Sequence, residues 1–317
     1  MRRTLVALAA SAVLLPACTD GTDVERASPP TPGATGVDAS TTAIPPGSSP
    51  TGASSPAPST PAPPEPDAWI PRRAGALART LEATWLARRE AVRRWTVSGN
   101  TGAWPPPDDV ELLVLHEQRI YRVLAADDRL AAIVLGRLGA GVAREAASNV
   151  RAGGALYDHF SPVKELPDFR TRPPVPPDVL RRYFDRAQER FGVDWEVLAA
   201  VMLIETRMGR IVSESSAGAQ GPMQFIPSTW AAYGLGGDVR EERDAILGAA
   251  NYLSASGAPS DYRGALFHYN PVPAYVTAVT GYANAMERDP DLFYAYYNWQ
   301  VFVRTTRGDV RLTGPGL

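Results

Sequence analysis

The stretch Asp194–Trp230 reads DWEVLAAVMLIETRMGRIVSESSAGAQGPMQFIPSTW. Its first part predicts a helix, because Asp194 can cap a first turn after the break at Gly192 and the apolar run Val197–Ile204 follows. This run leaves no polar face, and a helix that is apolar all round is a buried helix. The stretch therefore predicts a buried helix around which the rest of the chain is organised.

Glu205 ends this apolar run. Its neighbours one turn away on either side are all apolar: Val201, Met202, Met208 and Gly209. Burial disfavours the charged form and raises the pKa of a carboxyl group, and the negative end of the helix dipole acts in the same direction. A carboxyl group that stays protonated near neutral pH is a general acid. The alternative is that Glu205 pairs with Arg207 or Arg210, or lies on the surface where the helix ends.

A loop of small residues follows the helix. In Ser215–Pro222 the backbone can approach a ligand closely, and Met223–Pro227 continues from it. Such a loop after a buried acid predicts one wall of a cleft. It therefore favours the functional interpretation of Glu205.

Four motifs then occur in order: Glu205-Thr206-x-x-Gly209-Arg210, Ser216–Pro227, Ala249–Leu253 and Tyr269-Asn270. Together they resemble the lytic transglycosylases, which have a lysozyme-like fold and cut the glycan strands of peptidoglycan. The resemblance spans about residues 178 to 288, roughly a third of the chain. The Glu-Thr pair and the Gly-Pro-Met-Gln-Phe motif resemble the membrane-bound, B-like branch more closely than the soluble branch. Pro271 stands where many relatives have Ala-Gly.

The resemblance implies that Glu205 is catalytic, and it assigns substrate binding to Ser216, Met223, Gln224, Tyr252, Tyr269 and Asn270. In the family, the motif serine hydrogen-bonds the bound sugar, and the Met-Gln pair lines the subsites. The hydroxyl of Tyr269 would orient Glu205, whereas Asn270 would be mainly structural. Without the resemblance, Met223 would be a core residue, and the two tyrosines would be core aromatics with satisfied hydroxyls.

A second catalytic acid is absent from the motif positions. The next carboxylates, Asp238, Asp244 and Asp261, each precede or begin a predicted helix, which favours a capping role. The sequence thus predicts that Glu205 acts first as acid and then as base, which leaves 1,6-anhydro-muramic acid ends. The alternatives are a goose-type-lysozyme-like hydrolase and a catalytically silent glycan-binding or scaffold lipoprotein.

The N-terminal region predicts secretion and a lipid anchor. Arg2-Arg3 and the short apolar run Leu5–Leu15 are typical of a signal peptide over residues 1–17. Leu15-Pro16-Ala17-Cys18 resembles a bacterial lipobox, and Cys18 is the only cysteine in the chain. We therefore expect lipid on Cys18 and an extracytoplasmic place in the cell envelope, held to the cell membrane. The alternative is an ordinary secretory signal.

Residues 19–67 are rich in Pro, Ser, Thr, Ala and Gly, and they predict a disordered linker that could reach on the order of 100 Å. Residues 68–152 predict a helical extension of three segments, the third running from Leu130 to about Val150. The arginines of the first segment could touch an anionic polymer, although a charged helix side is usually solvated.

A proline-rich connector (153–177), a catalytic domain (178–290) and a tail (291–317) complete the predicted order. Within the catalytic domain the pattern predicts no strands. Besides the helix before Glu205, it predicts helices over about Asp178–Phe191, Ser228–Tyr233, Glu242–Ala255, Tyr262–His268 and Pro273–Arg288. In the tail, Val301–Val303 and Val310–Leu312 flank a turn and predict a hairpin. The expected fold is all-α, within the α+β lysozyme-like superfamily: a helical catalytic domain with an N-terminal helical extension and a small C-terminal β-hairpin.

Composition excludes several classes. The formal net charge of -2 leaves no electrostatic footprint for nucleic acid. His116, His159 and His268 lack metal-ligand spacing, so neither a metal nor a cofactor is predicted. No Gly-x-Ser-x-Gly elbow and no Walker loop occur. The expected partners are peptidoglycan strands and, through the lipid, the membrane; the sequence indicates no protein partner.

Overall fold

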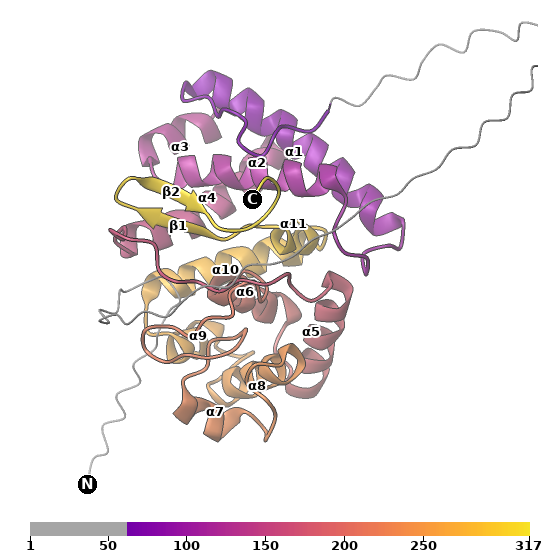
Figure 1. Ribbon diagram of the computed structural model, residues 1–317, viewed down its shortest axis with the longest axis vertical. Coiled ribbons are helices and arrows are strands. Elements are labelled where there is room, and N and C mark those ends of the chain that lie inside the picture. Colours follow the sequence, from indigo (N-terminus) through magenta and orange to yellow (C-terminus); the bar gives the residue numbers. More distant parts are fainter. Residues whose placement is uncertain (1–61) are drawn as a thin grey trace, which may run out of the picture. The chain divides into compact units, whose positions relative to one another are not determined.

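The computed structural model describes residues 62–317, and the helix α6 (Trp195–Thr206) lies in the middle of this part of the chain (Figure 1). Every residue of α6 except Glu196 is buried, as the apolar run predicts. The signal peptide, Cys18 and nearly all of the predicted linker lie outside the described residues. No helix among residues 62–317 is long and apolar enough to cross a membrane.

The start of α6 differs from the prediction. Asp194 makes no capping hydrogen bond with its side chain. Instead, the backbone N–H of Trp195 donates to Gln188 Oε1 at 2.7 Å, and that of Asp194 donates to the Tyr262 hydroxyl at 2.8 Å. A glutamine from the preceding helix therefore satisfies the first free N–H group of α6.

Four helices precede the predicted catalytic domain: α1 (Ala74–Val97), α2 (Asp108–Ala125), α3 (Asp128–Leu135) and α4 (Ala140–His159). The third predicted segment is thus two helices, because Asp127 caps α3 and the chain turns at Gly136–Gly139. The last helix also continues through the first seven residues of the predicted connector. At Gly153 an added side chain would lie 3.5 Å from Ala125 of α2, which is an ordinary contact; this glycine lies within the helix and does not end it.

The catalytic part is helical, and its further helices are α5 (Pro177–Phe191), α7 (Pro227–Tyr233), α8 (Glu242–Ala255), α9 (Tyr262–Tyr269), α10 (Pro273–Arg288) and α11 (Leu292–Tyr297). The sequence pattern missed only α11 among them. The helix α10 packs along both α4 and α6, so it joins the N-terminal helices to the catalytic part (Figure 1). At Gly281 of α10 a side chain would meet Ala152 at 3.1 Å, which explains the close approach of α4.

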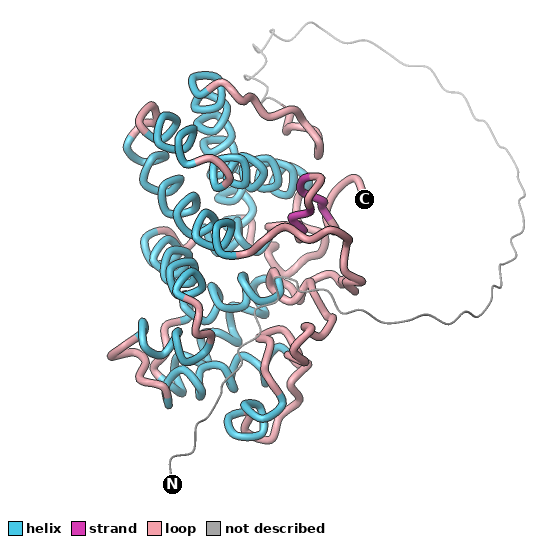
Figure 2. Tube along the Cα trace, turned by 90° about the vertical axis from the view of Figure 1, so that its left-hand side faces the viewer, coloured by secondary structure: helices cyan, strands magenta, loops and turns pink. Residues whose placement is uncertain are grey.

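The predicted hairpin is present as β1 (Phe302–Thr305) and β2 (Gly308–Arg311), paired antiparallel with Val303 opposite Val310. It stands beside the helices on the side where loops gather (Figure 2). Arg122 of α2 fixes it by an ion pair with Asp309, whose Nε–Oδ2 distance is 2.7 Å. Its first strand also meets the connector, through a bridge between Thr305 and Val163.

One arginine of α1, Arg88, is buried and does not lie on an exposed, charged side of the helix. Arg88 has no exposed surface; its Nε lies 3.2 Å from Glu117 Oε2, and its guanidinium also pairs with Glu145. Trp85 donates a further hydrogen bond of 2.7 Å to Glu145. Two acids from α2 and α4 thus hold one cation, which couples three helices around a buried charge.

Candidate active site

Glu205 lies at the C-terminal end of α6 with 3% of its surface exposed. Its predicted apolar neighbours Val201, Met202 and Met208 have no exposed surface at all. The two arginines offered as alternative partners point to carbonyl groups: Arg207 donates to Leu203 O, and Arg210 donates to Tyr297 O at 2.6 Å. The carboxyl group is therefore held against hydrophobic surface, as the sequence predicts.

Two tyrosines from later in the chain, Tyr269 and Tyr275, lie near Glu205. Burial, and then the charge of Glu205, raise the pKa of Tyr269 and that of Tyr275 well above the ordinary range. Interaction of the Tyr275 hydroxyl with the Glu205 side chain adds to the effect on the pKa of Tyr275. Both hydroxyl groups thus stay protonated, but only that of Tyr275 is directed to the carboxyl group. The single proton of the Tyr269 hydroxyl is donated to Met223 O, so the expectation that this hydroxyl orients Glu205 is wrong.

Tyr275 was missed by the sequence analysis. It is the third residue of α10, two positions after Pro273, and it has no exposed surface. The signal was present, since a tyrosine on an apolar helix side needs a partner for its hydroxyl. That partner could not be named, because Tyr275 and Glu205 meet only through the packing of α10 on α6.

The loop after Glu205 is fastened to the helix by the next residue. The Thr206 hydroxyl donates to Pro222 O at 2.7 Å and accepts from the Gly209 N–H at 3.0 Å. Arg207, Met208 and Gly209 all adopt positive φ, which turns the chain sharply away from the helix. The Glu-Thr pair therefore places the loop and the acid together.

Gly221 allows this loop to pass the segment before α8. Its φ is +72°, and a methyl group there would lie 1.8 Å from the carbonyl oxygen of Val239. A short bridge between Gln220 and Phe225 closes the turn. Gln224 stands inside this turn with φ +51°, and its side-chain amide donates to Gly221 O at 3.0 Å.

The other predicted substrate residues differ in exposure. Ser216 is exposed in a turn that Ser215 closes by accepting from the Ala219 N–H at 3.0 Å. Met223 has no exposed surface, and its carbonyl oxygen accepts from the Tyr269 hydroxyl at 2.6 Å. Asn270 is 2% exposed and ends α9.

Four tyrosines form a row that leads from the half-exposed surface to Glu205: Tyr233, Tyr252, Tyr269 and Tyr275. Successive ring centroids lie 4.7, 5.5 and 6.4 Å apart. We call this set the tyrosine row. The hydroxyl of Tyr252 is used internally, because it donates to His268 O at 2.8 Å. The sequence singled out Tyr252 and Tyr269 but missed Tyr233 and Tyr275.

A further buried carboxylate lies near the site, and the sequence analysis did not name it. Glu242 of α8 is 5% exposed, and its Oε1 would lie 3.4 Å from a side chain at Gly209. It forms an ion pair with Arg172 of the connector. Among the predicted caps, Asp261 accepts from Gly264 N–H at 2.8 Å, as expected, whereas Asp244 bonds the Asp238 N–H rather than a helix end.

Within residues 62–317, no group of three or more His, Cys, Asp or Glu side chains could hold a metal ion. The described site combines the buried carboxyl group of Glu205 with tyrosine hydroxyl groups and aromatic faces.

The comparisons with known proteins agree with this geometry. Residues 182–288 match the family model of the transglycosylase SLT domain. It is a lysozyme-like helical domain, so the lytic transglycosylase recognised in the sequence is confirmed for these residues.

One relative is described as membrane-bound lytic murein transglycosylase F, from Thiobacillus denitrificans. It is 35% identical over 106 residues, which are 32% of this chain and 22% of the relative. The chain thus spans less than a quarter of the length of that relative. The word membrane-bound agrees with the expected membrane-bound branch. No solved structure shows significant similarity.

Proposed function

We propose that the chain is a lytic transglycosylase that cleaves the β-1,4 bond between N-acetylmuramic acid and N-acetylglucosamine in peptidoglycan. The observation that carries the proposal is Glu205, 3% exposed at the end of an apolar helix, with the Tyr275 hydroxyl directed to its side chain. Burial favours the protonated carboxyl group, which is the form that a general acid needs. The family of residues 182–288 supports peptidoglycan as the substrate.

In the first step Glu205 gives its proton to the glycosidic oxygen, and the bond from this oxygen to C1 of muramic acid breaks. The 2-acetamido group of the same sugar supports the positive charge that develops at C1, with Ser216 orienting that group. In the second step the Glu205 carboxylate takes the proton of the C6 hydroxyl. The C6 oxygen attacks C1, a 1,6-anhydro ring closes and Glu205 is protonated again, so no water is consumed.

A single carboxyl group suffices for this sequence, whereas ordinary glycosidases need two. Glu242, the other buried acid beside the loop, is engaged by Arg172 and does not supply a free base. Glu205 is therefore the acid and the base in two protonation states.

The substrate-binding roles of Ser216, Met223, Gln224, Tyr252, Tyr269 and Asn270 belong to the same proposal. Sugar rings present apolar faces, and the tyrosine row offers aromatic surface that begins at half-exposed rings. The hydroxyl of Tyr269 is bonded to the Met223 carbonyl, so it positions the loop as well as lying near Glu205. Asn270 ends α9 and keeps Tyr269 in place.

We further propose that the protein acts in the cell envelope, on the extracytoplasmic side, with lipid on Cys18. The lipobox-like Leu15–Cys18 supports the anchor. The name of the transglycosylase F relative supports a place at the membrane.

Digestion of purified peptidoglycan by the full chain in detergent, in ¹⁸O-labelled water, tests the proposal. We expect anhydro-muropeptides without ¹⁸O, read by mass spectrometry. Glu205→Gln should lower the rate at least about a hundredfold, the scale of a positioned general acid. Glu196→Gln, at the other end of α6, is the matched control and should keep the rate.

Two other results would replace the proposal. Reducing ends that carry ¹⁸O would indicate the goose-type-lysozyme-like hydrolase. Folded protein that binds glycan strands but releases no muropeptide would indicate the silent scaffold.

A further inference from the structure

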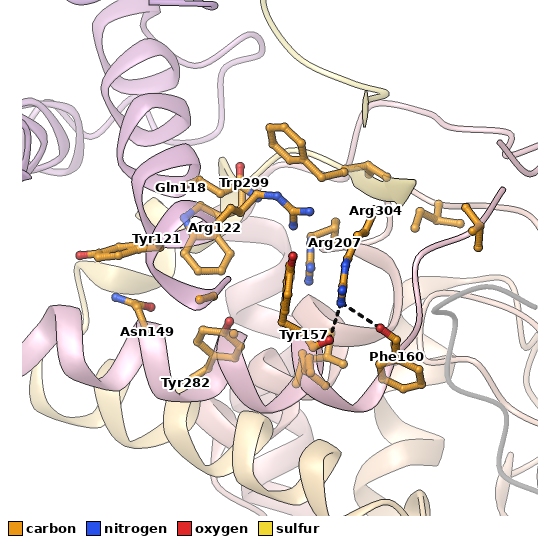
Figure 3. A pocket seen from close by; sticks show the side chains of 18 of the residues that line it. Gln118, Tyr121, Arg122, Asn149, Tyr157, Phe160, Arg207, Tyr282, Trp299 and Arg304 are labelled. Atoms are coloured by element: carbon orange, nitrogen blue, oxygen red, sulfur yellow. Dashed lines mark hydrogen bonds between the residues drawn. The ribbon is translucent and has the colours of Figure 1, made fainter. Parts of the chain in front are cut away.

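A cavity of about 150 Å³ lies between α2, α4, the end of α6 and the hairpin (Figure 3). Ile204 and Arg207 bring α6 to its wall, whereas Glu205, between them in sequence, is not among the lining residues. The cavity is therefore separate from the candidate active site, although the same helix end contributes to both.

Three arginines line this cavity: Arg122, Arg207 and Arg304. Their side chains gather on one side of it (Figure 3). Of these three arginines, only Arg122 has a carboxylate partner within residues 62–317, namely Asp309. The other two donate to backbone carbonyls, Arg304 to Phe160 O at 3.0 Å and Arg207 to Leu203 O. The described lining thus carries three cations and no acid.

The backbone of Arg207 has an unusual conformation, which places its side chain in the wall of the cavity. Its φ is +53°, in the left-handed region that side chains rarely adopt. Burial lowers its pKa, and the nearby charge of Arg122 acts in the same direction. A guanidinium nevertheless stays charged at neutral pH, so an anion in the cavity would relieve the cost of burying it.

The rest of the lining is largely apolar and aromatic. The apolar residues include Leu156, Phe169, Ile204, Val301 and Phe302. Two polar side chains of the lining are engaged within the protein: Gln118 bonds the backbone of Gln300, and Asn149 accepts from the Tyr296 hydroxyl at 2.8 Å. A ligand for this cavity must therefore bring negative charge and a small apolar body.

We propose that the cavity binds the terminal carboxylate of a peptide that ends in a small apolar residue. An engineered cavity of about 150 Å³ holds one benzene molecule, and a terminal alanine residue is of similar size. The carboxylate would meet the arginine forks, which match its planar geometry. The methyl group would meet the apolar wall, and the rest of the peptide would leave past the exposed Ser161.

Inorganic phosphate fits less well than such a residue. It could use the same arginines, but it has no apolar part to cover Leu156, Ile204 and Phe302 and would leave those walls wet. The arginines provide the charge selectivity, and the apolar wall selects for a small side chain.

Calorimetric titration of the full chain in detergent tests this site by binding alone, so its result is independent of the proposed glycan cleavage. The probe is N-acetyl-D-alanyl-D-alanine, compared with its C-terminal amide, with inorganic phosphate and with soluble peptidoglycan fragments that carry or lack peptide stems. We expect the free acid to bind and the amide and phosphate to bind at least about tenfold more weakly. Binding of the stem-carrying fragments in addition to the dipeptide would identify the stem as the source, and binding of the dipeptide without the fragments would identify free peptides.

Arg304→Gln and Arg122→Gln should each weaken binding of the dipeptide about tenfold or more, and Arg207→Gln should do the same if it folds. Arg129→Gln, on the exposed side of α3, is the matched control and should bind as the wild type. The proposal would be overturned if the amide or inorganic phosphate bound as tightly as the free acid. It would also be overturned if neither Arg304→Gln nor Arg122→Gln weakened binding, or if the dipeptide gave no heat at millimolar concentration.

Discussion

The rings of Tyr269 and Tyr275 lie parallel, with 3° between their planes and 6.4 Å between their centroids. Their hydroxyl groups have different partners. That of Tyr269 donates to Met223 O at 2.6 Å, whereas that of Tyr275 interacts with the Glu205 side chain. One ring of the pair thus fixes the loop, and the other is directed to the acid.

Tyr275→Phe should lower the rate of peptidoglycan cleavage about tenfold or more, because a hydrogen bond to a charged group is lost. Loss of a donor to the carboxylate also favours its protonated form. The alkaline limb of the pH–rate profile should therefore move to higher pH. Tyr297→Phe, a buried tyrosine packed on Arg210, is the control. An unchanged pH–rate profile in Tyr275→Phe would show that the Tyr275 hydroxyl does not act on Glu205.

Gly221 and Gly218 give a matched test of the loop. Both have positive φ, +72° and +77°, but a methyl group meets Val239 O at 1.8 Å in the first and nothing within 4 Å in the second. Gly218→Ala should cost about 1 kcal/mol of backbone strain. Gly221→Ala should cost about 2 kcal/mol more through the clash and should also lower the activity. Denaturant unfolding measures both; equal losses would show that the loop moves aside.

The buried pair of Arg88 and Glu117 predicts a pH dependence of stability. Burial raises the pKa of Glu117 from 4.5 to about 7, although Arg88 acts to lower it. Between these pH values the folded protein holds a proton that the unfolded chain has released. The stabilisation is therefore fully present below about pH 4.5, and the free energy of unfolding should fall by up to about 1.4 kcal/mol per pH unit until pH 7.

Glu117→Gln should remove this part of the pH dependence, since the amide does not titrate. Urea unfolding at pH 5 and pH 7.5 gives the slope for wild type and variant, with the exposed Glu189→Gln as control. A variant with the wild-type slope would assign the dependence to other groups.

Cys18 carries the prediction about the anchor. Metabolic labelling with a fatty acid should mark the wild-type protein and leave Cys18→Ser unmarked, because no other cysteine is available. Wild-type protein should also partition into detergent. Label in neither protein would leave the ordinary secretory signal as the interpretation.

Much of the helical layout follows from local pattern. The apolar run before Glu205 forms the buried α6, and the predicted spans Glu242–Ala255 and Pro273–Arg288 match α8 and α10. The helix α11 was missed because its short run Leu292–Tyr297 is almost wholly aromatic and has no polar side to give a helical period.

Contacts between distant segments could not be predicted in the same way. Arg88 has the surroundings of an exposed arginine in sequence, and only the packing of α2 and α4 brings Glu117 and Glu145 to it. Tyr275 likewise meets Glu205 only across a helix interface. The predicted order of domains and the roles of the substrate residues stay predictions.

The segment that precedes α1 is held by side chains of α2 and β2. Arg119 of α2 donates to Pro66 O at 3.0 Å and to Ala68 O at 2.8 Å, and Arg311 of β2 lies 3.7 Å from Asp67. A pull along the chain from its N-terminal side is thus received by α2 and the hairpin. A force of this kind would therefore have to break the contacts of Arg119 and Arg311 before it extends the chain into α1.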